Sequence, residues 1–201
     1  MAKADYGSRC LFFERCSPFV PIIHETGYTF TDDNVHVKLA IFALASRHHK
    51  SLADMSETLY SLAKQTTNST LNTPSMNTLI AMTLLAVYEI GQPYAALNAL
   101  TTLSSALALM GAFQLDRMDQ PNFSFTCLWL SKPKNWVVEE GRRRVAWMII
   151  CLARWAAALT GQNFGISTRL DIQMLLPVSD KAWNAAVSLL KYVSLLAHAS
   201  N

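Results

Sequence analysis

Charged side chains are concentrated in one short stretch of the chain. Glu139 and Glu140 stand just before a run of three arginines, Arg142, Arg143 and Arg144. An acid four residues before a base stabilises a helix, and both acids have an arginine at that spacing. The run has the composition of a phosphate contact, but the acids partly neutralise it and consecutive helical residues face different directions. We interpret it as the solvated start of a helix and predict no DNA-binding residues.

Cysteines and histidines do not have the spacing of a metal site. Cys10 and Cys16 have no second pair nearby, whereas zinc sites bring together closely spaced ligands. His48 and His49 are adjacent, so on a helix they point about 100° apart and do not face one metal. The sequence also lacks G-x-S-x-G, H-E-x-x-H and a glycine-rich phosphate loop. We predict no metal ligand, no cofactor and no catalytic residue, so the chain is not expected to be an enzyme.

Arg154 is the charged residue that most needs an explanation. It lies within the apolar and small residues of 151–158, and a buried guanidinium needs an acid or several carbonyl groups. We predict that Arg154 pairs with Asp171 or Glu89 and fixes the packing of its helix. The alternative is that Arg154 faces solvent on a thin polar side of the helix.

Three tryptophans, Trp147, Trp155 and Trp183, are candidates for the core or for a ligand pocket. Large aromatic side chains dominate core burial, so we predict that they fill the core. The pocket interpretation stays open. The structural or regulatory candidates are Arg154, its proposed partners Asp171 and Glu89, and also Arg144 and Trp147.

The elements that hold these residues are all predicted to be helices. Apolar residues recur at steps of three and four after the arginine run, and Gly161 is a candidate left-handed cap at the end of that helix. Thr168 and Asp171 have the spacing of a capping box for a second helix, which Pro177 would end. Alternating β-branched runs are absent. The fold class is therefore all-α, an irregular array of about seven to eight helices.

Further helix signals precede and follow this region. Predicted helices run from Asp32 or Asp33 to His49, from Ser51 and Asp54 to Thr67, from Thr73 and Pro74 to Glu89, from Tyr94 to Met110, and from Ser179 or Asp180 to His198. Residues 114–137 lack a helical pattern and indicate a surface loop.

Composition indicates one intracellular domain, residues 1–201. The net charge of +3 comes from mixed acids and bases without a basic stripe, and the start of the chain lacks the apolar core of a signal peptide. The stretch from Tyr94 to Leu115 is uncharged and long enough to cross a bilayer. Its polar residues fall on one helical face, which favours a helix of a soluble bundle. A membrane-associated helical protein remains the alternative.

The order of motifs along the chain resembles a known family. An acid and arginine run, a tryptophan and an apolar helix ending in Gly161 are followed by Ile166, by Asp171 and Ile172, and by Leu176 and Pro177. Two further motifs are the segment from Phe12 to His24 and the segment from Leu84 to Glu89, which leads to Leu115 and Asp116. Over residues 8–183 this order resembles the fungal-specific transcription factor domain, the middle regulatory region of fungal zinc-cluster transcription factors.

The resemblance implies an all-helical, non-catalytic regulatory domain that acts in the nucleus on DNA-templated transcription. Full-length relatives carry a six-cysteine zinc cluster for DNA binding, which no stretch of this chain resembles. Expected partners are proteins, either a second copy or a full-length transcription factor, with DNA contacted only indirectly and no membrane. A small all-α enzyme or ligand-binding protein remains an alternative function.

Two departures from the family pattern concern the C-terminal part. Gln162 and Asn163 replace the Arg-Pro often found after the glycine, and the chain ends soon after Trp183. We expect the C-terminal half of the regulatory region to be truncated. Apolar residues of the last helix would then lack a cover and favour self-association; they are Leu189, Leu190, Val193 and Leu196.

Overall fold

The protein is all-α, as predicted. The computed structural model describes residues 2–25, 28, 34–92, 96–120, 126–161 and 174–188, and these contain no strand. The α-helices are α1 (Ala2–Arg15), α2 (Val35–Ser46), α3 (Ser56–Ser69), α4 (Met76–Ile90), α5 (Ala96–Ala112) and α6 (Trp136–Thr160). Three short 3₁₀ helices span Ala53–Met55, Thr70–Asn72 and Leu115–Arg117. A further helical segment covers residues 180–188.

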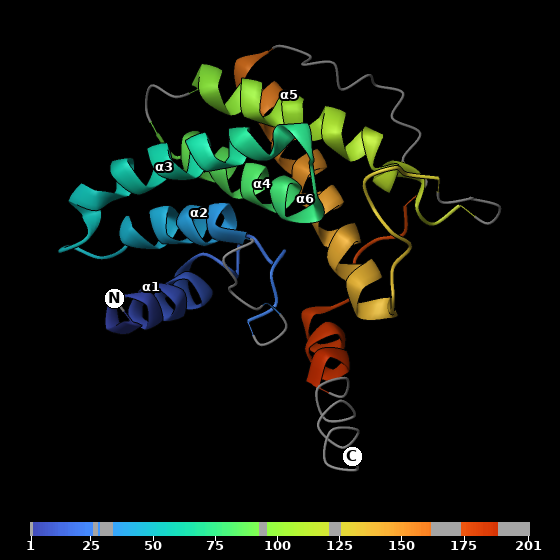
Figure 1. The fold of residues 1–201 in the computed structure, drawn as a ribbon, viewed down its shortest axis with the longest axis horizontal. Coiled ribbons are helices and arrows are strands. Elements are labelled where there is room, and N and C mark those ends of the chain that lie inside the picture. The colour runs from blue at the N-terminus through green and yellow to red at the C-terminus, as the bar shows by residue number, and fades with distance from the viewer. Residues whose placement is uncertain are drawn as a thin grey trace.

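The helices pack around α4. Helix α2 packs against α1, α3 and α4, and α5 packs against α4 and α6. Helix α6 runs from the region of α5 to the 180–188 helix, with its N-terminal end beside that helix (Figure 1). Pro21, which follows α1, also reaches this part of α6, because its carbonyl oxygen accepts a hydrogen bond from Arg144.

The core centres on α4 because that helix is apolar on nearly all sides. Every side chain from Thr78 to Ala86 is buried, as expected for a helix without a polar face. Phe12 of α1, Ile41 of α2 and Ile149 of α6 are fully buried in the same cluster. Segments far apart in the sequence thus share one hydrophobic core.

Helix ends test the predicted caps. Gly161 ends α6 with φ of 67°, which confirms the predicted left-handed cap. The amide of Ala182 donates to Ser179 Oγ over 3.3 Å, which confirms the predicted cap of the last helix. Helix α6 begins before the acid pair, because the side chain of Asn135 accepts a hydrogen bond from the Val138 amide at 3.0 Å.

Other predicted helix starts were wrong. Ser75 caps α4 in a capping box with Thr78, so Thr73 is not the cap. Ser51 and Asp54 form no capping box, and α3 instead begins at Ser56, whose hydroxyl donates to Ala43 O. The predicted capping box of Thr168 and Asp171, the caps at Asp32 and Asp33, and residues 189–198 lie outside the described residues.

Helix α5 is amphipathic. Asn98, Thr101 and Ser105 are exposed, whereas Leu103 and Met110 are buried. Within the part of the chain that the structure describes, no helix combines the length and apolar character that a membrane crossing requires.

Candidate functional site

The three arginines of α6 are buried, so the prediction of a solvated helix start was wrong. Arg142 is 7% exposed, and Arg143 and Arg144 are each 4% exposed. Glu140 is completely buried and accepts hydrogen bonds from Arg143 and Arg144. The spacing of acids and bases along a helix is the same on an exposed face and on a buried one, so it could not predict burial. In the structure, carboxylates from other segments bind the arginine run.

Arg143 is the centre of a group of carboxylates. Its guanidinium donates two hydrogen bonds to Asp119, from Nε to Oδ2 at 3.0 Å and from Nη2 to Oδ1 at 2.5 Å. It also donates to Glu140 Oε2 at 2.7 Å and to Glu139 Oε1 at 3.2 Å. The hydrogen bonds to Asp119 raise the pKa of Arg143 above its usual value, although burial opposes this. Burial would raise the pKa of the Asp119 carboxyl, but its bonds to Arg143 and Leu175 outweigh this and lower it.

Arg144 joins both ends of the described chain to α6. Its Nη1 donates to Asp180 Oδ1 at 2.6 Å and to the carbonyl oxygen of Pro21 at 3.3 Å. Its Nη2 donates to the carbonyl oxygen of Val178 at 2.7 Å, and Nε donates to Glu140 at 3.0 Å. The planar guanidinium also lies over the ring of Trp183, with Cζ 4.2 Å from the centroid.

Arg143 and Arg144 form an ion cluster with Asp119, Glu139, Glu140 and Asp180. Acids of this ion cluster also bind the backbone of residues 174–188, which we call the C-terminal segment. Asp119 Oδ2 accepts a hydrogen bond from the Leu175 amide at 2.8 Å, and Glu140 Oε1 accepts one from the Val178 amide at 3.0 Å. Trp147 Nε1 donates to the carbonyl oxygen of Leu175 at 2.8 Å. The C-terminal segment is therefore docked on α6 by polar contacts with several side chains, supported by the buried Met174, Trp183 and Val187.

Arg154 does not form the predicted lock with Glu89. Arg154 is exposed on α6, in agreement with the alternative of a thin polar side. Glu89 is buried and binds Lys64 Nζ at 2.7 Å and Tyr60 Oη at 2.6 Å instead. Asp171, the other predicted partner of Arg154, lies outside the described residues.

The three tryptophans have different environments. Trp183 is buried, as predicted, whereas Trp155 is 50% exposed, so its assignment to the core was wrong. Trp147 is partly buried, packs against the core and bonds the C-terminal segment through its indole nitrogen. Trp183 also lines a pocket.

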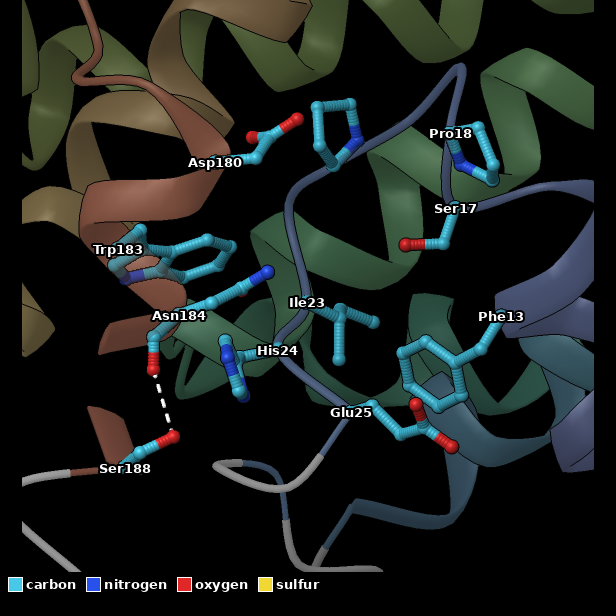
Figure 2. A pocket seen from close by; sticks show the side chains of 11 residues that line it. Phe13, Ser17, Pro18, Ile23, His24, Glu25, Asp180, Trp183, Asn184 and Ser188 are labelled. Carbon is cyan, nitrogen blue, oxygen red and sulfur yellow. Dashed lines mark hydrogen bonds between the residues drawn. The ribbon is translucent and has the colours of Figure 1, made fainter. Parts of the chain in front are cut away.

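The pocket lies beside the ion cluster and has a volume of about 390 Å³. Figure 2 shows Phe13 of α1 on one side, Trp183 and Asn184 of the 180–188 helix on the other, and His24 and Ile23 between them. The rings of His24 and Trp183 form a T-shaped contact, with centroids 5.2 Å apart and an interplanar angle of 88°. The same contacts that dock the C-terminal segment therefore form one wall of the pocket.

Sequence reasoning missed Asp119 and Asp180 as cluster residues. Asp119 lies in the predicted loop, and Asp180 was considered only as a helix cap. The ion pairs of Arg143 with Asp119 and of Arg144 with Asp180 span 24 and 36 positions. The only available signal was the excess of basic residues in the run over the two acids before it.

The cysteines do not fit the zinc cluster that relatives carry. Such a cluster is held by six thiolates, and this sequence has four cysteines. Cys16 is buried, and burial raises the pKa of its thiol to about 11, which opposes thiolate formation. Among the described residues, no group of three or more His, Cys, Asp or Glu is placed to hold a metal ion.

These features define an all-helical domain whose basic run serves internal packing and whose one end carries a pocket. The chain belongs to the fungal specific transcription factor domain family, which it matches over residues 11–188. Membership implies a role in transcription regulation, and no zinc-cluster family is matched. The comparisons with curated proteins and with solved structures found no match.

Proposed function

We propose that this chain is a regulatory interaction domain that controls transcription in the nucleus through protein contacts, without catalysis and without its own DNA readout. The observation that carries the proposal is the burial of the arginine run. Arg142, Arg143 and Arg144 are the densest basic cluster of the sequence, and at 4% to 7% exposure they present no basic surface to phosphate. The basic run is a packing feature of the domain.

Exposed apolar side chains supply the contact area that a protein partner needs. Leu175 and Leu176 are 66% and 72% exposed within the C-terminal segment, and Leu128 and Trp129 are exposed before α6. Exposed apolar groups of this kind favour protein association. The partner is a full-length transcription factor of the same family or a second copy of this chain, and DNA is contacted only through that partner.

Co-purification tests the proposal. The tagged chain is produced together with a full-length family member that carries a zinc cluster, and is expected to co-purify with it and to change transcription of its reporter. The variant L175D/L176D should lose the partner and keep its unfolding midpoint, whereas Leu97→Asp on α5, also exposed, is the matched control. Absence of any such complex, or retardation of DNA by the isolated chain at physiological salt, would contradict the proposal.

Self-association is measured separately by light scattering over a concentration series. A second copy as partner predicts a mass that rises with concentration. A clean monomer at high concentration removes the second copy and leaves the full-length relative as the proposed partner.

A further inference from the structure

The pocket has the size of a small-molecule site. Its volume of about 390 Å³ falls in the range of sites that bury small ligands, which are mostly apolar with a few directed polar groups. Phe13, Ile23 and Trp183 supply apolar surface. A compact ligand with an aromatic or aliphatic body fits this surface.

The charged groups that line the pocket are acidic. Glu25 and Asp180 contribute carboxylates, and the described lining contains His24 but no lysine or arginine. Arg9 is not part of the lining, but it is close to it: its guanidinium donates to the carbonyl oxygen of Glu25 and lies 6.0 Å from the centroid of the Phe13 ring. The Glu25 carboxylate is exposed and forms no hydrogen bond or ion pair with the described residues. It is therefore available to a ligand.

The ion cluster next to Trp183 also contains more acidic than basic side chains. Arg143 and Arg144 form ion pairs with four carboxylates, those of Asp119, Glu139, Glu140 and Asp180. The guanidinium of Arg144 is thus paired with the carboxylates of Glu140 and Asp180. The Trp183 ring already binds one cation on its face, which shows that this aromatic wall accepts positive charge.

We propose that this pocket binds a small organic cation, an amine or guanidine with an apolar body, and that the bound ligand holds the C-terminal segment docked on α6. The apolar body lies between Phe13 and Trp183, and the cationic group faces the carboxylate of Glu25, which is unpaired among the described residues. Asp180 takes part only through Oδ2, because Arg144 already occupies its Oδ1. The regulatory meaning of this binding rests on the proposed function, but the binding itself does not.

Coupling to the C-terminal segment follows from shared residues. Asp180 and Trp183 line the pocket and also contact Arg144. Undocking of the C-terminal segment removes both residues and leaves only the wall formed by α1 and residues 17–25. A ligand that contacts both walls binds the docked state better and shifts the equilibrium towards it.

Calorimetric titration of the full chain tests the ligand class with phenethylammonium as the probe. Its uncharged and anionic counterparts are 2-phenylethanol and 3-phenylpropionate. We expect a dissociation constant of about 1 mM or lower for the cation, and at least about tenfold weaker binding of the anion. No binding of the cation, or binding of the anion with equal strength, would overturn the proposal.

Glu25→Gln locates the cation. Because the Glu25 carboxylate has no internal bond among the described residues, this variant should keep the unfolding midpoint and bind phenethylammonium about fivefold more weakly. Glu14→Gln is the matched control, since Glu14 is an exposed acid of α1 that pairs with Arg15 and does not line the pocket. Equal loss in both variants, or no loss in Glu25→Gln, would refute the assigned position.

Hydrogen exchange tests the coupling. Saturating phenethylammonium should slow exchange of the Leu175 and Val178 amides about tenfold and leave the core amides of α4 unchanged. Unchanged exchange at these two amides would overturn the docking effect. Neither measurement uses a protein partner, so a failure here is distinct from a failure of the co-purification experiment.

Discussion

Two buried charged networks in this domain differ in what they connect. The ion cluster around Glu140 joins α6 to Pro21, Asp119 and the C-terminal segment. Among the described residues, the network around Glu89 joins α3 and α4 alone, through Tyr60 and Lys64. The first therefore sets the position of chain segments that lie outside helices α1 to α5, whereas the second aligns two helices that already share a core.

Their bonding also differs. Glu140 receives hydrogen bonds from two guanidinium groups and one amide. Glu89 accepts two hydrogen bonds, from Tyr60 and Lys64, and both go to Oε1. Its other oxygen, Oε2, is buried and has no hydrogen-bond partner among the described residues. Lys64 is partly exposed, so water competes for its ammonium. We infer that the ion cluster contributes more to stability than the Glu89 network, and four predictions test this ranking.

Glu140→Ala should have the largest effect. It leaves two buried guanidinium groups without their central acid, and removing one partner from a buried ion pair costs about 3–5 kcal/mol of unfolding free energy. Denaturant unfolding measures the loss. Glu139→Ala is the control because Glu139 is partly exposed and makes one bond at 3.2 Å, so its loss should stay below about 1 kcal/mol. Equal losses would contradict a central role for Glu140.

Arg144→Lys should have the next largest effect. Lysine keeps the charge but not the planar fork that reaches Asp180, Val178 and Glu140 and stacks on Trp183. We expect a loss of about 2 kcal/mol and faster proteolytic cleavage within residues 174–188. Cleavage sites in α2 and α3 serve as the internal reference. Unchanged cleavage in the C-terminal segment would show that Arg144 does not hold it.

Glu89→Gln should be milder. Glutamine retains an acceptor for Tyr60, and Lys64 can turn to water, so the loss should be about 1 kcal/mol. The same denaturation measurement ranks it against Glu140→Ala. A larger loss for Glu89→Gln than for Glu140→Ala would reverse the comparison between the two networks.

The two networks should limit stability at opposite ends of the pH scale. The pKa of Asp119 is lowered by folding, so its contribution is present above the unfolded value of about 4 and is lost as pH falls through the folded value. Burial and the bond to Glu89 raise the pKa of Tyr60 to about 12, so stability falls as pH rises from about 10 to that value. Unfolding midpoints across pH should show both slopes.

Two variants assign these slopes. Asp119→Asn should flatten the acid side, because the residue no longer titrates. Tyr60→Phe should flatten the alkaline side. A wild-type slope in either variant would assign that pH dependence to a different group.

The sequence predicted most of the helices but little of the site, for a physical reason. Periodic apolar residues fixed the helical class, and Gly161 was correctly assigned as a cap. Ser179 was one of two candidates for the last helix. Local pattern alone misplaced the starts of α3 and α4. The burial of Arg143 depends on Asp119, and that of Arg144 on Asp180. Those acids are distant in sequence and carry no local pattern. Arg154 shows the converse, since its apolar neighbours in sequence do not surround it in space.

The bond from Arg144 to the carbonyl oxygen of Pro21 spans 123 positions, which has a consequence for biosynthesis. Residues 17–25 are synthesised long before Arg144, which binds them. They therefore lack this contact while the nascent chain already contains α1 to α5. Contacts this distant form late because loop closure opposes them. The pocket therefore matures only after translation reaches Trp183, and premature termination upstream of that residue yields chains that fold in part but lack it.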